Sequence, residues 1–421
     1  MRRVFILSLL AAGIISCMAC TSNDAPLSDN NGSGPSADAL ISKTKAYPSD
    51  YATEATHRGR VERIDYDTRD YAEGSGATRT NTAYVYLPYG YDENTAQRYN
   101  VIYLVHGHYG TASTTFEAEN GLQRKVLDHM VENGDMAPTI VVSPSYNYGQ
   151  PTPDYIDADP YCKALPLELV NDLIPILETR YRTYLASPDR EGIEASRSHR
   201  AIGGFSMGGV TTWYALAETF NAFEYYMPIS GDCWSLGAFA GMNQPQRTAD
   251  YLANIVRQSL YANDFYIWAA SGTSDSAYSE ILLQVRAMAG ITDVFGIDQM
   301  TFHEKDGARH EFRPTVEYVY NALPYFFPSN EGGATAIKQV DINATSFGKT
   351  YSVIGMVSDG HGIVIQNGKK YINSKKIKVY EKSFQHHYFY TRCFCYWLLS
   401  LFQRRQQQRY TQWNGGDCTR Q

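Results

Sequence analysis

The chain has 421 residues, of which 43% are hydrophobic and 19% charged, and it contains 33 glycines and 17 prolines. This is the composition of a globular protein, and the length suits two ordinary domains or one large domain with extensions. With 37 Lys and Arg against 44 Asp and Glu, the formal net charge is -7. That balance excludes a nucleic acid or an anionic lipid surface as the main partner.

The first 20 residues have the pattern of an export signal. Arg2 and Arg3 precede an apolar run from Val4 to Ile15, which is too short to span a bilayer as a mature helix. Cys17 and Cys20 each follow a small residue, so the segment resembles a bacterial lipoprotein signal. Cys17 fits the lipidation pattern better and Cys20 is the alternative. An ordinary secretory signal with incidental cysteines is the other interpretation.

Residues 21–46 are rich in Ser, Asn, Asp, Gly and Pro. Such a segment has little to bury and predicts a flexible tether, with the folded part beginning near Tyr47. We therefore expect an extracytoplasmic protein, either lipid-anchored to the cell envelope, at the outer membrane, or secreted. The N-terminal lipid would be its only contact with a membrane.

Cysteine and histidine spacing predicts no metal site. Cys162 and Cys233 are the two cysteines of the expected folded part. In an oxidising compartment they could form a disulfide, and two separate buried thiols are the alternative. No Cys or His residues of the folded part group at metal-ligand spacing, so we expect no metal and no cofactor.

Short apolar runs alternate with helical patterns from Tyr51 to Phe327, which is typical of an α/β protein with a largely parallel sheet covered on both faces. The expected strands are 101–105, 139–143, 199–204 (apolar at 201–203), 225–229, 265–270 and 299–304. The expected helices are 122–131, 167–180, 210–220 and a closing helix at about 315–327.

One motif in this pattern indicates a catalytic residue. Gly204-Phe-Ser206-Met-Gly208 is a Gly-x-Ser-x-Gly sequence between an expected strand and an expected helix. This is the context of a nucleophile elbow, in which the flanking glycines let the strand and the helix approach closely. We therefore predict an α/β-hydrolase fold with Ser206 as the nucleophile. A plain strand-to-helix turn is the structural alternative.

A serine nucleophile needs a histidine base and a carboxylate that orients it, and in this fold they follow in the order Ser, Asp, His. Asp275 and His310 each lie in a loop after a later strand, so we predict them as the acid and the base. Asp232, after an earlier strand, is the competing acid. His303 lies within a strand and is expected to be a core residue, and Asp306 is expected to be a turn residue.

Two backbone amides should form the oxyanion hole. The first is that of Met207, at the start of the helix behind the serine. The second should come from the loop His106-Gly-His108-Tyr109-Gly110, where we assign His108, with Tyr109 as the second choice. Tyr109 is also a candidate substrate-binding residue. His106 is expected to hold the loop by hydrogen bonds.

Beyond the serine motif, several segments have a recognisable pattern, namely 203–214, 227–234, 269–278 and 307–310 with 321–327. Together they resemble the feruloyl esterase modules of carbohydrate esterase family one, especially those attached to clostridial xylanases. The resemblance covers roughly residues 48–328 and implies that serine, aspartate and histidine match Ser206, Asp275 and His310. It also implies that Trp234 lines the acyl pocket, with a core tryptophan as the alternative. Cys233 stands where those modules have an aromatic residue.

The C-terminal part is less informative. Residues 329–383 are interpreted as a linker and a short β-rich extension, in which Asn367-Gly368 predicts a hairpin turn. The extension resembles small β-rich C-terminal extensions of secreted Bacteroidetes proteins. Residues 384–421 stay unassigned.

These observations predict a serine ester hydrolase that needs no cofactor. The resemblance implies a feruloyl esterase that removes hydroxycinnamoyl groups from plant xylan, so feruloylated or acetylated cell-wall polysaccharide is the expected partner. An acetyl xylan esterase is the first alternative, because the sequence does not show the size of the acyl pocket. An acyltransferase using the same triad and a non-catalytic glycan-binding protein are the others.

Overall fold

The computed structural model describes residues 40–150 and 152–327, together with three short strands between residues 351 and 373. In the larger part, nine strands form one sheet in the order β1-β9-β8-β7-β6-β4-β5-β3-β2. In this spatial order, all neighbouring strands from β1 through β9 and β4 to β5 pair in parallel. The last two strands, β3 and β2, pair antiparallel. The strands are β1 Ile41–Lys43, β2 Arg60–Arg69, β3 Thr78–Leu87, β4 Asn100–Val105, β5 Thr139–Ser143, β6 Arg200–Phe205, β7 Tyr225–Ile229, β8 Tyr266–Gly272 and β9 Met300–Lys305.

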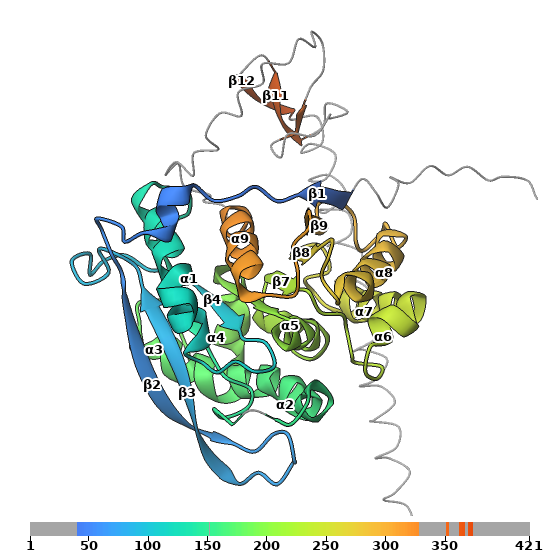
Figure 1. Ribbon diagram of the computed structural model, residues 1–421, viewed down its shortest axis with the longest axis horizontal. Helices are drawn as coiled ribbons and strands as arrows, with labels where there is room; N and C mark the ends of the chain where they lie inside the picture. The colour runs from blue at the N-terminus through green and yellow to red at the C-terminus, as the bar shows by residue number, and fades with distance from the viewer. Residues whose placement is uncertain (1–39, 151, 328–350, 353–361, 367–368, 374–421) are drawn as a thin grey trace, which may run out of the picture. The chain divides into compact units, whose positions relative to one another are not determined.

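Helices cover both faces of this sheet, as the alternation predicted. Successive side chains of a strand point to opposite faces, and in β4 Tyr103 packs in one apolar cluster while Ile102 packs in the other. Figure 1 shows α1 and α9 beside each other, apart from α5, α7 and α8. The helices are α1 Thr114–Glu132 (with non-helical backbone at Ala118–Gly121), α2 Tyr155–Glu168, α3 Ile174–Arg180, α4 Arg190–Ala195, α5 Met207–Glu218, α6 Ala240–Asn243, α7 Pro245–Gln258, α8 Tyr278–Ala289 and α9 Phe312–Ala322.

The sheet begins earlier than the expected boundary at residue 47. Residues 41–43, assigned to the tether by composition, form the edge strand β1, which pairs with β9. Lys43 makes ion pairs with Glu304 at 2.9 Å and with Asp306 at 2.6 Å. The prediction was wrong here because a three-residue edge strand is too short to show a period and has one polar, exposed side.

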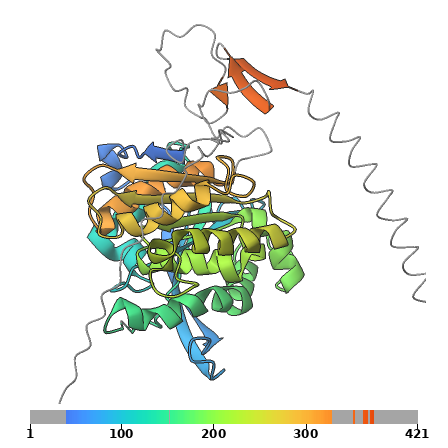
Figure 2. The same ribbon diagram turned by 90° about the vertical axis from the view of Figure 1, so that its right-hand side faces the viewer.

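A long antiparallel hairpin closes the opposite edge of the sheet. Strands β2 and β3 pair over ten residues each, and Figure 2 shows the hairpin extending beyond the helices. These two strands are not among those predicted from the sequence, since both are rich in charged and polar residues. The closing helix also differs: α9 ends at Ala322 rather than near residue 327, because Pro324 follows and cannot continue the helical hydrogen bonds.

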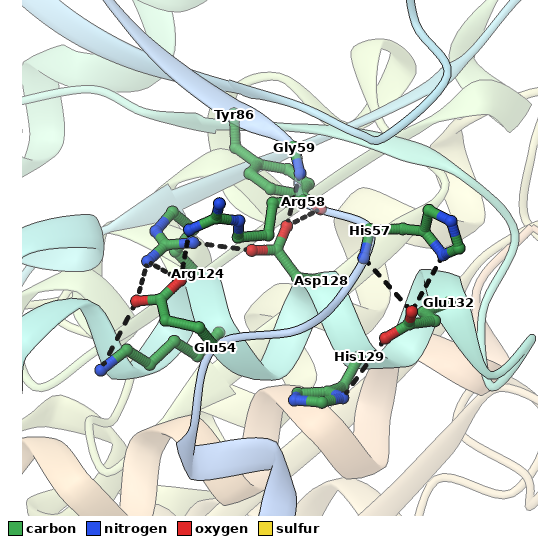
Figure 3. Close-up of polar contacts among 10 residues, drawn as sticks. Glu54, His57, Arg58, Gly59, Tyr86, Arg124, Asp128, His129 and Glu132 are labelled. Atoms are coloured by element: carbon green, nitrogen blue, oxygen red, sulfur yellow. Dashed lines mark hydrogen bonds and ion pairs between the residues drawn. The ribbon is translucent and has the colours of Figure 1, made fainter.

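A buried carboxylate fixes α1 against the segment that leads into β2 (Figure 3). Asp128 accepts hydrogen bonds from the Gly59 amide at 2.8 Å, the Tyr86 hydroxyl at 2.9 Å and Arg124 at 2.8 Å. Arg124 also pairs with Glu54 at 2.7 Å. Three donors compensate the cost of burying this carboxylate. The network therefore holds α1 in place.

The structure also tests the expected state of the two cysteines of the folded part. Cys162 and Cys233 are both buried and free, so the possible disulfide does not form. Among the described residues, no helix has the length and apolarity needed to cross a membrane.

The three strands described between residues 351 and 373 belong to a second unit of the chain. Its described strands, β10 Tyr351–Ser352, β11 Gly362–Gln366 and β12 Lys369–Asn373, make an antiparallel sheet. β11 and β12 pair as the predicted hairpin requires, while Asn367-Gly368 itself lies outside the described residues. So do the signal with Cys17 and Cys20, residues 21–39 of the tether, and residues 384–421.

Candidate active site

Ser206 stands in a tight turn between β6, the middle strand of the sheet, and α5. Its φ of 57° and ψ of -118° are strained values for a residue with a side chain. A Cβ on Gly204 would lie 2.5 Å from the Val105 carbonyl oxygen, and one on Gly208 would lie 2.2 Å from the same oxygen. Only glycine fits at these two positions, as the elbow motif predicts.

The structure brings together the three residues predicted as a triad. The Ser206 Oγ lies 2.9 Å from His310 Nε2, and His310 Nδ1 lies 2.7 Å from Asp275 Oδ1. In the neutral imidazole, Nδ1–H donates to Asp275, which leaves Nε2 free to accept the serine proton. Asp275 is 7% exposed and also accepts the Ala277 amide at 2.8 Å. This geometry suits general-base activation of the serine.

Asp232, the competing acid, has a different partner. It is fully buried, and its two oxygens accept hydrogen bonds from Trp234 Nε1 at 2.6 Å and from the Met242 amide at 3.0 Å. Burial raises the pKa of Asp232 to about 6, and the bond from Trp234 opposes this rise. The structure therefore makes Asp232 the anchor of the indole, while Asp275 is the carboxylate that binds His310.

The other two competitors are structural, as expected. His303 stacks on Trp268 with ring centroids 4.2 Å apart and contacts the Thr301 hydroxyl at 3.0 Å. Burial lowers the pKa of His303 to about 4, which keeps it neutral at ordinary pH. Asp306 lies in the turn after β9 and pairs with Lys43. Neither contacts the Ser206 and His310 pair.

The expected oxyanion loop is held by the residues that follow β5. His106 Nδ1 contacts the Gly107 carbonyl at 2.8 Å, and its Nε2 contacts the Ser145 hydroxyl at 2.9 Å. The Tyr146 hydroxyl donates to the Gly107 carbonyl at 3.1 Å. The Asn147 amide donates to the Gly110 carbonyl at 3.2 Å. His106 thus has the expected loop-holding role.

Three of these residues, Ser145, Tyr146 and Asn147, are not among the site residues predicted from the sequence. The signal available was a polar run immediately after the buried strand β5, which lies next to β4 in the sheet. Because parallel neighbours end at the same edge, this run meets the loop that follows β4.

Met207 is the first residue of α5. The first amides of a helix have no acceptor within the helix, so the Met207 N–H is available to a developing oxyanion. His108 lies in the opposite loop and is 9% exposed. Neither of its ring nitrogens has a partner among the described residues, and burial lowers its pKa. Tyr109, by contrast, is 80% exposed at the cavity rim.

One cavity of about 730 Å³ is lined by Ser206, His310, Met207 and His108. Trp234 is 3% exposed and packs with Phe239 at 4.6 Å and Tyr155 at 6.4 Å between ring centroids, so this wall is aromatic. Glu280 also lines the cavity and is not among the residues predicted from the sequence. Residues on its walls include Leu104, His106, Gly107, His108, Tyr109, Gln123, Ser206, Met207, Met227, Trp234, Phe239, Glu280, His310, Phe312 and Val319.

Comparisons with known proteins agree with this chemistry. The model of the Esterase family, described as "Putative esterase", matches residues 75–321. The endo-1,4-beta-xylanase Y of Acetivibrio thermocellus is 35% identical over 286 residues, which are 66% of this chain and 24% of that protein. The endo-1,4-beta-xylanase/feruloyl esterase of Xylanibacter ruminicola is 28% identical over 43% of this chain and 23% of that protein. The chain thus spans about a quarter of the length of these relatives.

Solved structures give the same result. A mutant of the feruloyl esterase module from Clostridium thermocellum, complexed with sinapinate, is 33% identical, with a TM-score of 0.60, over 70% of this chain and 97% of that one. A ferulic acid esterase from Anaeromyces mucronatus shares the fold at 20% identity, with a TM-score of 0.50, over 67% and 95% of the two chains. The chain therefore belongs to the Esterase family and has an α/β-hydrolase fold, in which Ser206, His310 and Asp275 have the arrangement of a serine-esterase triad.

Proposed function

We propose that this protein hydrolyses feruloyl and related hydroxycinnamoyl esters carried by plant xylan. The observation that carries the proposal is the Ser206, His310 and Asp275 arrangement, which opens into a cavity of about 730 Å³ with an aromatic wall. Cavities of this size hold ligands far larger than an acetyl group. A flat indole such as that of Trp234 suits a planar aromatic acyl group.

The chemistry follows from the positions of the groups. Ser206 Oγ attacks the ester carbonyl while His310 Nε2 takes the serine proton, and the Met207 amide donates to the oxyanion. Collapse of the tetrahedral intermediate breaks the bond to the alcohol, which receives the proton from His310. Water then attacks the acyl-enzyme by the same route and releases the free acid. Asp275 keeps the imidazole in the required tautomer.

The relatives support the choice of substrate. Both curated relatives are named as xylanases, one of them also as a feruloyl esterase, and the solved module binds sinapinate, a substituted hydroxycinnamate. We extend this chemistry to the present chain, so that the alcohol released is a sugar hydroxyl of the polysaccharide.

Hydrolysis of methyl ferulate, methyl p-coumarate and 4-nitrophenyl acetate side by side tests the proposal. We expect kcat/KM to be highest for the two hydroxycinnamates, with free acid as the product. A clear preference for acetyl esters, on 4-nitrophenyl acetate and on acetylated xylan, would instead make the protein an acetyl esterase. Transfer of the acyl group to an added sugar in place of hydrolysis would make it an acyltransferase.

We also propose that the mature protein is a lipoprotein of the cell envelope, anchored through Cys17, with Cys20 as the alternative. The basis is the signal pattern of residues 1–20. Labelling with a radioactive or alkyne-tagged fatty acid in a bacterial host should mark the wild type and the Cys20→Ser variant but not Cys17→Ser. Labelling of Cys17→Ser with loss in Cys20→Ser would move the anchor, and no labelling at all would exclude it.

A further inference from the structure

Glu280 is a half-buried carboxyl group that the triad mechanism does not use. It lies in the first turn of α8 and lines the same cavity as Ser206 and His310. Within residues 40–150 and 152–327, no hydrogen bond or ion pair is made by its side chain. Burial raises the pKa of Glu280 to about 7, with the negative charges of Asp232 and Asp275 adding to the rise and His310 opposing it.

Glu280 and Trp234 line the same cavity. One helical turn later, the Gln284 side chain accepts a 2.6 Å hydrogen bond from the Cys233 amide, which joins α8 to the loop after β7. In that loop, Asp232 binds Trp234 Nε1. Residues four apart lie on one face of a helix, so Glu280 faces the same side as Gln284.

We propose that Glu280 is a specificity-determining residue whose carboxyl group hydrogen-bonds a hydroxyl on the aromatic ring of the acyl group that packs against Trp234. The inference rests on the proposed function and deepens it. It names the feature of the acyl group that the cavity recognises beyond its flat shape, namely a polar ring substituent.

The chemistry of a carboxyl group suits this role. A phenolic O–H donates to an ionised carboxylate, and a protonated carboxyl group can donate to the phenolic oxygen, so the contact survives the titration of Glu280. A ring without a hydroxyl would cover the carboxyl group and leave it without a partner. Sites of this kind discriminate strongly against the analogue that lacks the group, because a polar atom is then left buried and unpaired.

The test compares methyl ferulate and methyl p-coumarate, which have a ring hydroxyl, with methyl cinnamate, which has none. We expect Glu280→Ala to lower kcat/KM about tenfold for the first two esters and less than about twofold for methyl cinnamate. Glu280→Gln, which keeps a donor and an acceptor, should recover most of the loss. Glu117→Ala is the matched control, since Glu117 is an exposed carboxylate of α1 outside the cavity lining.

Two outcomes would overturn the inference while leaving the proposed function intact. If Glu280→Ala lowers kcat/KM equally for all three esters and shifts their pH profiles together, the carboxylate acts through its charge on His310. If the loss appears only with a feruloylated arabinose, the recognised hydroxyl is on the sugar. By contrast, a wild-type enzyme that hydrolyses no hydroxycinnamate would refute the proposed function and the inference with it. Thermal unfolding of each variant separates these effects from misfolding.

Discussion

Trp234 Nε1 donates a 2.6 Å hydrogen bond to Asp232 Oδ1, and both residues are almost completely buried, at 3% and 0% exposure. A buried indole N–H needs such an acceptor. The bond fixes the ring plane as a wall of the cavity, with Phe239 packed at 4.6 Å between centroids. Asp232, the alternative triad acid predicted from the sequence, thus helps to determine the shape of the cavity.

Replacing Trp234 with alanine should change specificity more than turnover in general. The loss of aromatic contact should lower kcat/KM for methyl ferulate by about fivefold or more, which corresponds to about 1 kcal/mol or more. Hydrolysis of 4-nitrophenyl acetate, whose acyl group has no ring, should barely change. Both rates are measured on one preparation, because misfolding lowers them together. Equal losses would mean that Trp234 is only a packing residue.

Isosteric substitution distinguishes the roles of Asp275 and Asp232. Asp275→Asn should lower kcat by about three to four orders of magnitude for every ester, because the amide no longer holds the His310 tautomer. Asp232→Asn should cost far less, and mainly for aromatic acyl groups through the orientation of Trp234. Steady-state kinetics on methyl ferulate and 4-nitrophenyl acetate distinguish them. The opposite ranking would make Asp232 the triad acid.

Gly208→Ala should disrupt the elbow. Its new Cβ would lie 2.2 Å from the Val105 carbonyl oxygen, a backbone atom that cannot move without shifting β4. We expect both a lower melting temperature and weaker labelling of Ser206 by a fluorophosphonate. Gly290→Ala is the control, since its nearest neighbour would be 3.3 Å away. A Gly208→Ala protein with normal stability and labelling would contradict the packing described for the elbow.

Glu168 should make stability depend on pH. It is 1% exposed, accepts hydrogen bonds from Tyr66 at 2.6 Å and Asn81 at 2.7 Å, and burial raises its pKa from 4.5 to about 7. The folded state therefore holds the proton more tightly than the unfolded state. The stabilisation that Glu168 gives the folded state is fully present below pH 4.5. It decreases by roughly 3 kcal/mol as the pH rises to 7.

Glu168→Gln should remove that part of the pH dependence. Its free energy of unfolding, measured by urea denaturation at pH 4.5 and pH 8, should fall less between the two values than that of the wild type. The glutamine keeps an acceptor for Tyr66 and Asn81, so the fold should persist. Identical pH dependence in both proteins would show that Glu168 is ionised in the folded state at low cost.

The sequence predicted the strands from β4 to β9 because buried parallel strands are continuous apolar runs. It also predicted Ser206, Asp275 and His310 as a set, since the fold places their loops in a known order. The structure shows these residues in contact, while their catalytic roles stay predictions until tested.

What the sequence did not reveal depends on neighbours distant in the chain. β1 is short, and β2 and β3 are polar strands at an edge, so their place appears only once the sheet is assembled. Asn147 meets the oxyanion loop only because β5 lies beside β4. Glu280 faces the cavity only because α8 packs against the loop of Trp234.

The most direct test of the proposed active site measures the release of ferulate from methyl ferulate by chromatography. It compares the wild type with the Ser206→Ala and His310→Ala variants. The wild type should release free ferulic acid. Both variants should remain folded by circular dichroism and lose at least about three orders of magnitude in kcat. A folded Ser206→Ala protein that releases ferulate at the wild-type rate would contradict the assignment of this site.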